Sequence, residues 1–214
     1  FNDEYTNAAR SGNGARNVGC IIMDVNNGNV LAMAGYPVFD LNNPRDTSAL
    51  IGSPMVNEKG NIDYEAEVIS AENIDTLLSD DAKTYQNLNY LWKNFCISAT
   101  YEPGSVAKPF TVAAGLESGK MSGNEYYTCN GQLHVGDHDI KCHNYKSGGD
   151  GTLSVQESIE KSCNVALMLM GKQIGKSTFL EYQEKFNFGL KTNIDLYGES
   201  RTSSLVFNTQ SMGD

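Results

Sequence analysis

A serine and a lysine stand three residues apart, directly after a Pro-Gly turn, in the stretch YEPGSVAKP at 101–109. On a helix, residues three apart share one face, so Lys108 can reach the hydroxyl group of Ser105. In a desolvated site the neutral amine of a lysine is favoured, and it can accept the hydroxyl proton. The serine then becomes a nucleophile beside the positive end of the helix dipole. The spacing therefore suits acyl transfer at Ser105, with Lys108 as the base.

The same pattern also has a purely structural interpretation, which the tetrapeptide alone favours. Ser105 can cap a helix whose Lys108 faces solvent. The pattern occurs a second time at Ser158 and Lys161, where two neighbouring glutamates indicate a solvated helix face. A second motif is needed to decide between the two interpretations.

Ser-x-Asn is such a motif, because it supplies a second hydroxyl group to relay a proton and an amide to hold a substrate peptide. Three copies occur in the chain, and two of them have a central glycine, which is typical of turns. The third copy is Ser162-Cys163-Asn164. It lies between a helix that a capping box at Ser154 predicts and the apolar run 165–170. A polar trio between two helices at the edge of a core calls for a functional reason.

The elements that must position these residues follow from hydrophobic patterns. Two apolar segments, 18–25 and 30–36, flank an Asn/Gly turn and predict a β-hairpin. Helical spacing or capping signals predict five helices, at 88–98, at 105–118, from 154 onward, at 165–174 and at 177–186. The segment 193–197 is strand-like. Strands followed by helices predict an α+β fold, with a helical cluster against an antiparallel sheet.

Composition limits the organisation of the chain and its partners. A length of 214 residues suits one domain with an insertion, and the acidic segment 45–86 is predicted to be that insertion. A formal net charge of −10 without a basic stripe argues against a nucleic-acid partner. The longest apolar run, 165–170, is far too short to span a bilayer. Five cysteines are too few for a disulfide scaffold, and an odd number precludes full pairing within the chain.

Two of the cysteines, Cys129 and Cys142, are close in sequence. Pairing outward from a hairpin turn predicted at 135–138 puts both on one face as diagonal neighbours. They could form a disulfide, remain free buried thiols, or bind a structural zinc ion with help from His143 or another His or Asp. His143 directly follows Cys142, so its side chain should point to the other face unless the strand ends or bulges there. These alternatives stay open.

Several segments resemble class B penicillin-binding proteins in the same order along the chain. The stretch YEPGSVAKPFTVAAGLESG from residue 101 is similar to the Ser-x-x-Lys segment of that family, including its Tyr-Glu-Pro-Gly lead-in. Further similar segments are GCIIMDVNNGNVLAMAGYPVFDLNNP at 19–44, SCNVALMLMGKQIG at 162–175 and NFGLKT at 187–192. The resemblance covers most of the chain, and residues 45–86 match least.

The resemblance implies a role for each polar residue of the two motifs. Ser105 would be the acyl-accepting nucleophile and Lys108 its base. Ser162 would be the proton relay, and Asn164 would contact an amide of the substrate. Acyl transfer in this family requires no cofactor, so the structural zinc considered above would be additional to the chemistry.

The third motif of the family, Lys-Ser/Thr-Gly, should follow Ser-x-Asn on a strand that lines the site. After Asn164 the nearest string is KTN from Lys191, which lacks the glycine, and KSG from Lys146 precedes Ser162. We therefore expect residues 1–214 to be a partial transpeptidase domain, truncated at both ends. The third motif, the N-terminal pedestal and the membrane anchor would be missing, and the piece alone should be inactive.

The resemblance implies a serine D,D-transpeptidase that cross-links peptidoglycan stem peptides through an acyl-enzyme and is inhibited by β-lactams. Such a protein would be anchored in the cell membrane, face outward, and work with the cell-wall synthesis machinery. A β-lactam-sensing receptor domain and a serine β-lactamase use the same first step and are the alternatives. Class D β-lactamases usually carry valine at the position of Asn164, and the segments DLNNP and YEPGS look more like the transpeptidases than the sensors.

Overall fold

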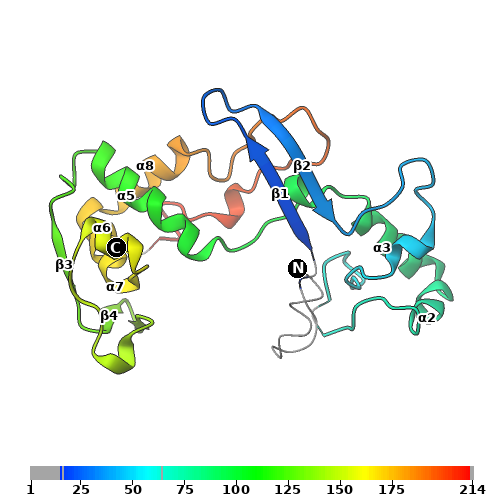
Figure 1. Ribbon diagram of the computed structural model, residues 1–214, viewed down its shortest axis with the longest axis horizontal. Helices are drawn as coiled ribbons and strands as arrows, with labels where there is room; N and C mark the ends of the chain where they lie inside the picture. The colour runs from blue at the N-terminus through cyan, green and yellow to red at the C-terminus, as the bar shows by residue number, and fades with distance from the viewer. Residues whose placement is uncertain (1–14, 16, 64, 213–214) are drawn as a thin grey trace. The chain divides into compact units, whose positions relative to one another are not determined.

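The computed structural model describes residues 15, 17–63 and 65–212, and the chain divides into two compact units (Figure 1). Unit 1 comprises Phe1–Thr100 with Asp195–Glu199, and unit 2 comprises Tyr101–Ile194 with Ser200–Asp214. Helices and antiparallel strand pairs occur together, which confirms the α+β class. Within the described residues, no helix has the length and apolar character needed to cross a membrane.

The predicted β-hairpin lies at the start of the described part of unit 1. β1 (Val18–Met23) pairs with β2 (Val30–Tyr36) in an antiparallel register. The turn between them closes through a hydrogen bond from the N–H of Asp24 to the carbonyl oxygen of Asn29. Gly28 in this turn has a φ of 77°, which glycine adopts without steric cost. The Asn/Gly signal therefore located the hairpin correctly.

The segment 45–86, predicted as an insertion, contributes to a small core rather than forming only an exposed loop. It contains the 3₁₀ turn η1 (Thr47–Leu50) and α2 (Ile74–Leu78), and it leads into α3 (Asp81–Leu91). These elements bury a shared set of apolar side chains: Leu50, Ile69, Ile74, Leu77, Leu88 and Leu91. The segment therefore has its own packing within unit 1.

The helix predicted over 88–98 is two helices. Asp80 caps the start of α3, because its carboxylate accepts hydrogen bonds from two N–H groups of the first turn. After α3 ends, Asn94 caps a separate short helix, α4 (Phe95–Ser98), by accepting from the N–H of Cys96. The apolar spacing was read correctly, but this second cap interrupts the helix.

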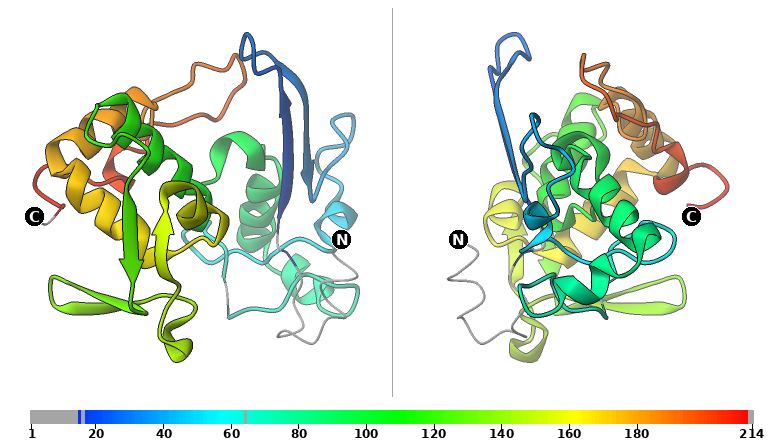
Figure 2. Two further views of the ribbon diagram at one scale, coloured as in Figure 1. Left: turned by 60° about the vertical axis from the view of Figure 1, so that its left-hand side comes forward. Right: turned by 90° about the vertical axis from the view of Figure 1, so that its right-hand side faces the viewer.

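Unit 2 carries both motifs at the starts of helices that pack together (Figure 2). α5 (Lys108–Glu117) continues directly from the 3₁₀ turn η2 (Gly104–Ala107). α7 (Asn164–Ile174) packs against α5, against α8 (Lys176–Lys185) and against the strand β3 (Tyr126–Cys129). The buried face of α7 thus fixes the start of that helix, where Ser-x-Asn lies, relative to α5.

The strands of unit 2 form two antiparallel pairs, β3 with β6 and β4 with β5. Their bounds are Tyr126–Cys129 for β3, Gln132–Val135 for β4, His138–Lys141 for β5 and Gly151–Ser154 for β6. The β4–β5 register is the predicted one, with Leu133 opposite Ile140. The described residues therefore hold three two-stranded pairs, including β1–β2, rather than the single sheet that we expected.

The core of unit 2 lies around α7 and the β3–β6 pair. α6 (Val155–Glu160) leads into it from the predicted capping box, in which Ser154 and Glu157 each accept a hydrogen bond from the other's N–H. The buried members are Met121, Tyr127, Cys129, Cys142, Leu153, Val155, Cys163, Val165, Ala166, Leu167, Met170 and Ile174. Three of the five cysteines therefore lie in this core.

The strand expected over 193–197 is absent from the structure. Leu196 is 50% exposed and Tyr197 is fully exposed, so each face of the segment leaves an apolar side chain open to solvent. A short strand is stabilised by a partner strand and by burial of its apolar face. The prediction was wrong because an apolar sequence alone provides neither a partner strand nor a surface that buries its side chains.

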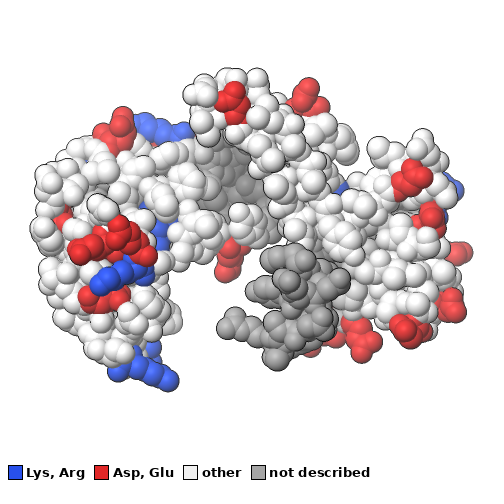
Figure 3. Space-filling model, viewed as in Figure 1, with Lys and Arg blue, Asp and Glu red and all other residues white. Residues whose placement is uncertain are grey.

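The surface reflects the acidic composition of the chain. On the face shown in Figure 3, acidic side chains are scattered, and Lys and Arg side chains form no continuous stripe. A binding surface for nucleic acid would instead cluster Lys and Arg along one face or helix. The face in view has no such cluster.

Candidate active site

Ser105 lies in the turn η2, immediately before α5. The chain enters this turn through Pro103 and Gly104, and the φ of 57° at Gly104 favours glycine. Pro109 occupies the first turn of α5, where its missing N–H leaves no hydrogen bond unmade. The result is an exposed Ser105 at the start of a helix and a half-buried Lys108 one turn later.

The Ser-x-Asn segment holds the amine of Lys108. Nζ donates hydrogen bonds to the carbonyl oxygen of Ser162 at 2.6 Å, to Ser162 Oγ at 2.8 Å and to Asn164 Oδ1 at 2.8 Å. Burial disfavours the ammonium form and lowers the pKa of Lys108, and nearby thiols oppose this shift. Two motifs more than fifty residues apart therefore meet at one amine.

Ser162 connects Ser105 to Lys108. Its Oγ lies 3.0 Å from Ser105 Oγ and 2.8 Å from Lys108 Nζ. In this arrangement Ser162 Oγ accepts from the ammonium and donates to Ser105. Among the hydrogen bonds of the described residues, Lys108 reaches Ser105 through Ser162, whereas the spacing alone suggested direct contact. When the amine is neutral, reversing both hydrogen bonds carries a proton from Ser105 to Lys108.

A left-handed turn presents the polar side chains of the Ser-x-Asn segment. Ser162 has a φ of 51°, a value that is uncommon for residues other than glycine. With this turn, Ser162 and Asn164 both reach Lys108, while Cys163 between them is fully buried. The turn accounts for the position of this segment between α6 and α7, because the side chains of Ser162 and Asn164 contact Lys108 and that of Cys163 lies in the core.

Both polar atoms of the Asn164 side chain have partners in the chain. Oδ1 accepts from Lys108, and Nδ2 donates to the carbonyl oxygen of Lys141 at 3.4 Å. The second distance is long for an N–H···O hydrogen bond, so that bond is the weaker one. If Asn164 contacts a substrate amide, as the resemblance implies, the bond to Lys141 is the one that such a contact would replace.

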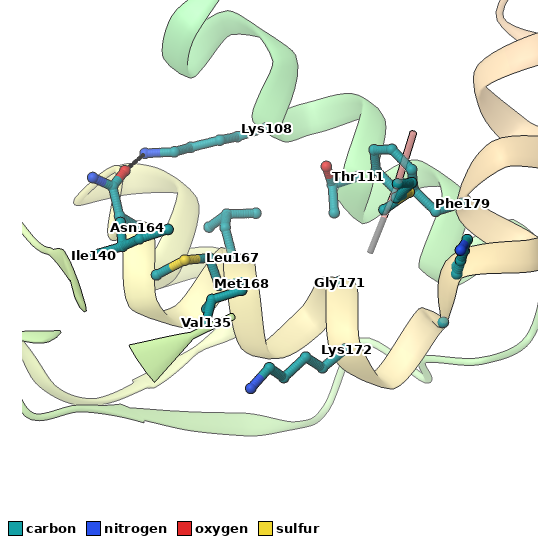
Figure 4. Close-up of a pocket in the computed structure, with 13 residues that line it drawn as sticks. Lys108, Thr111, Val135, Ile140, Asn164, Leu167, Met168, Gly171, Lys172 and Phe179 are labelled. Carbon is teal, nitrogen blue, oxygen red and sulfur yellow. Dashed lines mark hydrogen bonds between the residues drawn. The ribbon is translucent and has the colours of Figure 1, made fainter. Parts of the chain in front are cut away.

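A pocket of about 670 Å³ begins at this amine (Figure 4). Figure 4 shows Lys108 and Asn164 joined by their hydrogen bond at one end of it. Most of the lining is apolar and includes Val135, Ile140, Leu167, Met168 and Phe179. Ligand sites commonly have this size and character, with a few polar groups that fix orientation.

The second Ser-x-x-Lys pair forms no such site. Ser158 is fully buried, and its Oγ donates to the carbonyl oxygen of Ser154 at 2.7 Å. Lys161 is exposed. The prediction of a solvated face is therefore correct for Lys161 and wrong for Ser158. The KSG string at Lys146 lies in the 3₁₀ turn η3 (Tyr145–Ser147) and does not lie on a strand.

Cys129 and Cys142 lie together with two further groups. The Sγ atoms of Cys129, Cys142 and Cys163 and a carboxylate oxygen of Asp150 are all within 4.8 Å of one another, and we call these four residues the thiol cluster. All three cysteines are free thiols. His143 lies outside the cluster: its side chain is half exposed, with Nδ1 3.5 Å from Cys142 Sγ. The prediction that His143 joins Cys129 and Cys142 was therefore wrong, and Cys163 and Asp150 are the residues that lie with them.

Asp150 brings a negative charge into the thiol cluster. Its side chain is 1% exposed. Oδ1 accepts from Asn144 Nδ2, and Oδ2 accepts from the thiol of Cys142 at 3.1 Å. Burial opposes ionisation, but hydrogen bonds from Asn144, Cys142 and Cys163 lower the pKa of Asp150 to about 2. The carboxylate is therefore ionised at neutral pH.

Sequence reasoning missed Cys163 and Asp150 as members of this cluster. Cys163 stands inside a motif that was read only for its outer residues. Asp150 follows Gly149, which has a φ of 94°. Any Cβ atom at position 149 would collide with the carbonyl oxygen of Cys129. This close backbone approach places Asp150 beside the end of β3, and no periodic pattern signals it. The glycine-rich composition of the loop is the one available hint.

Comparison with known proteins places the chain in a family. The family described as penicillin binding protein transpeptidase domain matches residues 18–212. The chain is 34% identical over 123 residues to stage V sporulation protein D of Bacillus subtilis, covering 56% of this chain and 18% of that protein. It is 27% identical over 192 residues to PbpB of Mycolicibacterium smegmatis, covering 90% and 23%. The chain therefore spans about a fifth of the length of these curated relatives.

Solved structures share the fold. The D,D-transpeptidase domain of a peptidoglycan glycosyltransferase from Eggerthella lenta matches with a TM-score of 0.60 at 20% identity, covering 92% of this chain and 38% of that chain. PBP2 of Pseudomonas aeruginosa matches with a TM-score of 0.59 at 22% identity, covering 93% and 38%. Because the family match extends over nearly all of the described residues, the chain belongs to the penicillin-binding protein transpeptidase domain family.

Proposed function

We propose that this protein is a serine D,D-transpeptidase that cross-links peptidoglycan stem peptides through an acyl-enzyme on Ser105. The observation that carries the proposal is the hydrogen-bonded series from Ser105 Oγ to Ser162 Oγ to Lys108 Nζ, with steps of 3.0 and 2.8 Å. Family membership supports the same chemistry. A further relative, MrdA of Acinetobacter baumannii, is named a peptidoglycan D,D-transpeptidase and is 26% identical over 121 residues.

The geometry suggests how acylation would proceed. Ser105 Oγ attacks the carbonyl carbon of the penultimate D-alanine, while its proton passes to Ser162 and a proton of Ser162 passes to the neutral amine of Lys108. The tetrahedral intermediate collapses as the nitrogen of the terminal D-alanine takes a proton back along the same route. The amide bond breaks, D-alanine leaves, and an ester on Ser105 remains.

The second half of the reaction would reverse these proton movements. An amine of another stem peptide attacks the ester carbonyl and loses a proton to the relay. The new amide bond is the cross-link, and the Ser105 hydroxyl group is regenerated. A β-lactam offers a strained amide instead, and after ring opening its nitrogen stays tethered to the acyl group. The tethered group then occupies the place of the incoming amine, so the ester on Ser105 persists.

Penicillin labelling tests the acylation step. We expect the purified full-length protein to gain one penicillin by intact mass and peptide mapping to place it on Ser105, with Ser105→Ala unlabelled. A label on another serine, or undiminished labelling of Ser105→Ala, would overturn the assignment.

A peptide acyl donor with a D-amino acid acceptor tests the second half-reaction. Transfer to the acceptor is the expected result. A stable ester with no transfer would identify a sensor, and rapid hydrolysis of the β-lactam would identify a β-lactamase. Either outcome contradicts the transpeptidase proposal.

We also propose that the protein acts outside the cytoplasmic membrane, alongside the cell-wall synthesis machinery. Its relatives are named for peptidoglycan chemistry, and PBP2 of Helicobacter pylori, which shares the fold at 22% identity and a TM-score of 0.58, is described in complex with MreC. Cys20 is an exposed thiol that allows a direct test. A membrane-impermeant maleimide should label it in intact cells, or in cells whose outer membrane has been opened. Labelling only after lysis would contradict the location.

A further inference from the structure

We propose that Lys172 binds a carboxylate group of the acyl-donor stem peptide and favours donors in which that group is ionised. This inference rests on the proposed function and adds a specificity-determining residue to it. Lys172 lines the same pocket of about 670 Å³ that begins at the amine of Lys108. It lies in the last turn of α7, and Asn164 is the first residue of that helix. The two ends of one helix would therefore contact two different parts of the same peptide.

One face of α7 forms a wall of the pocket. The residues of α7 that line it have the i, i+3, i+4, i+7, i+8 spacing of a single helix face: Asn164, Leu167, Met168, Gly171 and Lys172. At a rise of about 1.5 Å per residue, the Cα atoms of Asn164 and Lys172 are about 12 Å apart. Figure 4 shows the Lys172 side chain extending back along α7 toward the end where Asn164 lies, as helical side chains do. A peptide that passes Asn164 and follows this face therefore reaches the amine of Lys172.

The lining combines apolar walls with positive charge. Among the thirteen described residues that line the pocket, three are lysines, Lys108, Lys172 and Lys176, and none is acidic. The whole chain has 26 acidic and 16 basic residues, so the pocket reverses the overall balance. Lys172 is exposed, and within the part of the chain that the structure describes no carboxylate forms an ion pair with it. Its amine is therefore available to an anionic group of a ligand, while the apolar walls suit methylene groups.

A stem peptide carries carboxylates at a matching distance from the bond that breaks. The residue before the penultimate D-alanine has its Cα atom about 5 Å from the scissile carbonyl carbon in an extended chain. Where that residue is a diamino dicarboxylic acid, its side chain places a carboxylate about 6 Å further on. One residue earlier, a D-glutamate joined through its γ-carboxyl group leaves its α-carboxylate about 12 Å from the scissile carbon. A flexible lysine side chain about 6 Å long lets Lys172 reach either carboxylate.

The sign of the charge determines which donors are favoured. A carboxylate gains an ion pair and charge-assisted hydrogen bonds from the ammonium group of Lys172. An amide in its place gains only neutral hydrogen bonds, and a lysine ammonium group in the peptide would be repelled. Because Lys172 is exposed, solvent screens the pair. We therefore expect a preference of about 2- to 5-fold in kcat/KM for the ionised donor.

Donor peptides that differ by one amidation test the proposal in the full-length protein. Four synthetic donors would carry both carboxylates free, either one amidated, or both amidated, and transfer to a D-amino acid acceptor would be measured. Amidation of the carboxylate that Lys172 binds should lower kcat/KM about 2- to 5-fold, and amidation of the other should have no effect. The donor that responds identifies which of the two carboxylates is bound. Equal kcat/KM for all four donors would overturn the proposal.

Charge reversal assigns the preference to this residue. Lys172→Glu should transfer the amidated donor faster than the ionised one, whereas Lys185→Glu should keep the original preference. Lys185 is a matched control, because it is the basic residue in the last turn of α8 and lies outside the described lining. Benzylpenicillin has an uncharged side chain, so it should acylate Ser105 in both variants within about twofold of the unchanged rate. A preference that survives Lys172→Glu, or that disappears in Lys185→Glu, would refute the role of Lys172.

The salt dependence of the unchanged protein is an independent measurement. At about 1 M salt the Debye length is ~3 Å, and an exposed ion pair is largely screened. The preference for the ionised donor should therefore approach 1, and a preference that salt does not alter would show that shape rather than charge selects the donor. Penicillin acylation with equal use of all four donors would refute this inference alone. Absence of both penicillin acylation and peptide transfer would refute the proposed function, and this inference with it.

Discussion

Replacing Lys108 by alanine removes the amine that would accept the proton of Ser105 through Ser162. It also removes three hydrogen bonds of 2.6 to 2.8 Å to the Ser-x-Asn segment. Losing a general base typically slows a reaction ~10²–10⁴-fold, which corresponds to about 3–5 kcal/mol of activation free energy. The folded state should lose less, because Lys108 is only half-buried and water can hydrogen-bond to the groups it leaves.

A second substitution separates proton transfer from anchoring. Arginine at position 108 keeps a positive charge and several donors, but it does not lose a proton in proteins. Lys108→Arg should therefore acylate about as slowly as Lys108→Ala. The matched control is Lys161→Ala, which changes the other Ser-x-x-Lys lysine at the same spacing on an exposed helix end. Its acylation rate should stay within about twofold of the unchanged protein, as expected for a surface substitution away from the site.

The assay is the second-order rate constant for acylation by a fluorescent penicillin, measured for all four proteins. Thermal unfolding of each variant without ligand shows whether a slow rate merely reflects an unfolded fraction. Equal rates for Lys108→Ala and Lys161→Ala would refute the role of Lys108 as the base. Near-normal acylation by Lys108→Arg would show that Lys108 contributes charge and hydrogen bonds rather than proton transfer.

Three further predictions test the surrounding structure. Ser162→Ala should lower the penicillin acylation rate ~10²-fold or more by removing the relay, whereas Ser158→Ala should leave that rate unchanged and cost about 1 kcal/mol of stability through its lost bond to the backbone. Gly149→Ala should lower the melting temperature more than Gly148→Ala, because both have positive φ but only at Gly149 would a Cβ atom collide with neighbouring backbone. Leu153→Ala, at 1% exposure, should cost ~2–5 kcal/mol in urea unfolding, and a loss below ~1 kcal/mol would contradict its place in the core.

Features with a short-range cause could be predicted from the sequence. The Asn/Gly turn at 26–29 set the β1–β2 hairpin, and the capping box at Ser154 set the start of α6, because each needs only a few adjacent residues. The same local reasoning went wrong where a second local signal intervened. Asn94 started a new helix inside the predicted one, and its cap was not recognised.

Features that depend on distant residues were predicted only in part. The resemblance named Ser105, Lys108, Ser162 and Asn164, but only the folded chain shows that Ser162 lies between the hydroxyl group of Ser105 and the amine of Lys108. Helix spacing gives the reach of Lys108 along its own helix. Helix spacing does not predict that Ser162, which follows Lys108 by 54 residues, lies between Lys108 and Ser105.

The Ser162-Cys163-Asn164 segment contacts both the amine of Lys108 and the buried thiol cluster of unit 2. Its outer side chains bind Lys108, and its middle side chain lies in the buried thiol cluster. Adjacent residues in one turn cannot move separately, since a change in φ or ψ at one displaces the others. A displacement of Cys163 by a few tenths of an ångström would therefore change the lengths of the hydrogen bonds that join Ser105, Ser162 and Lys108. Those bonds weaken steeply with poor geometry, so the packing around Cys163 sets how well Ser105 can be activated.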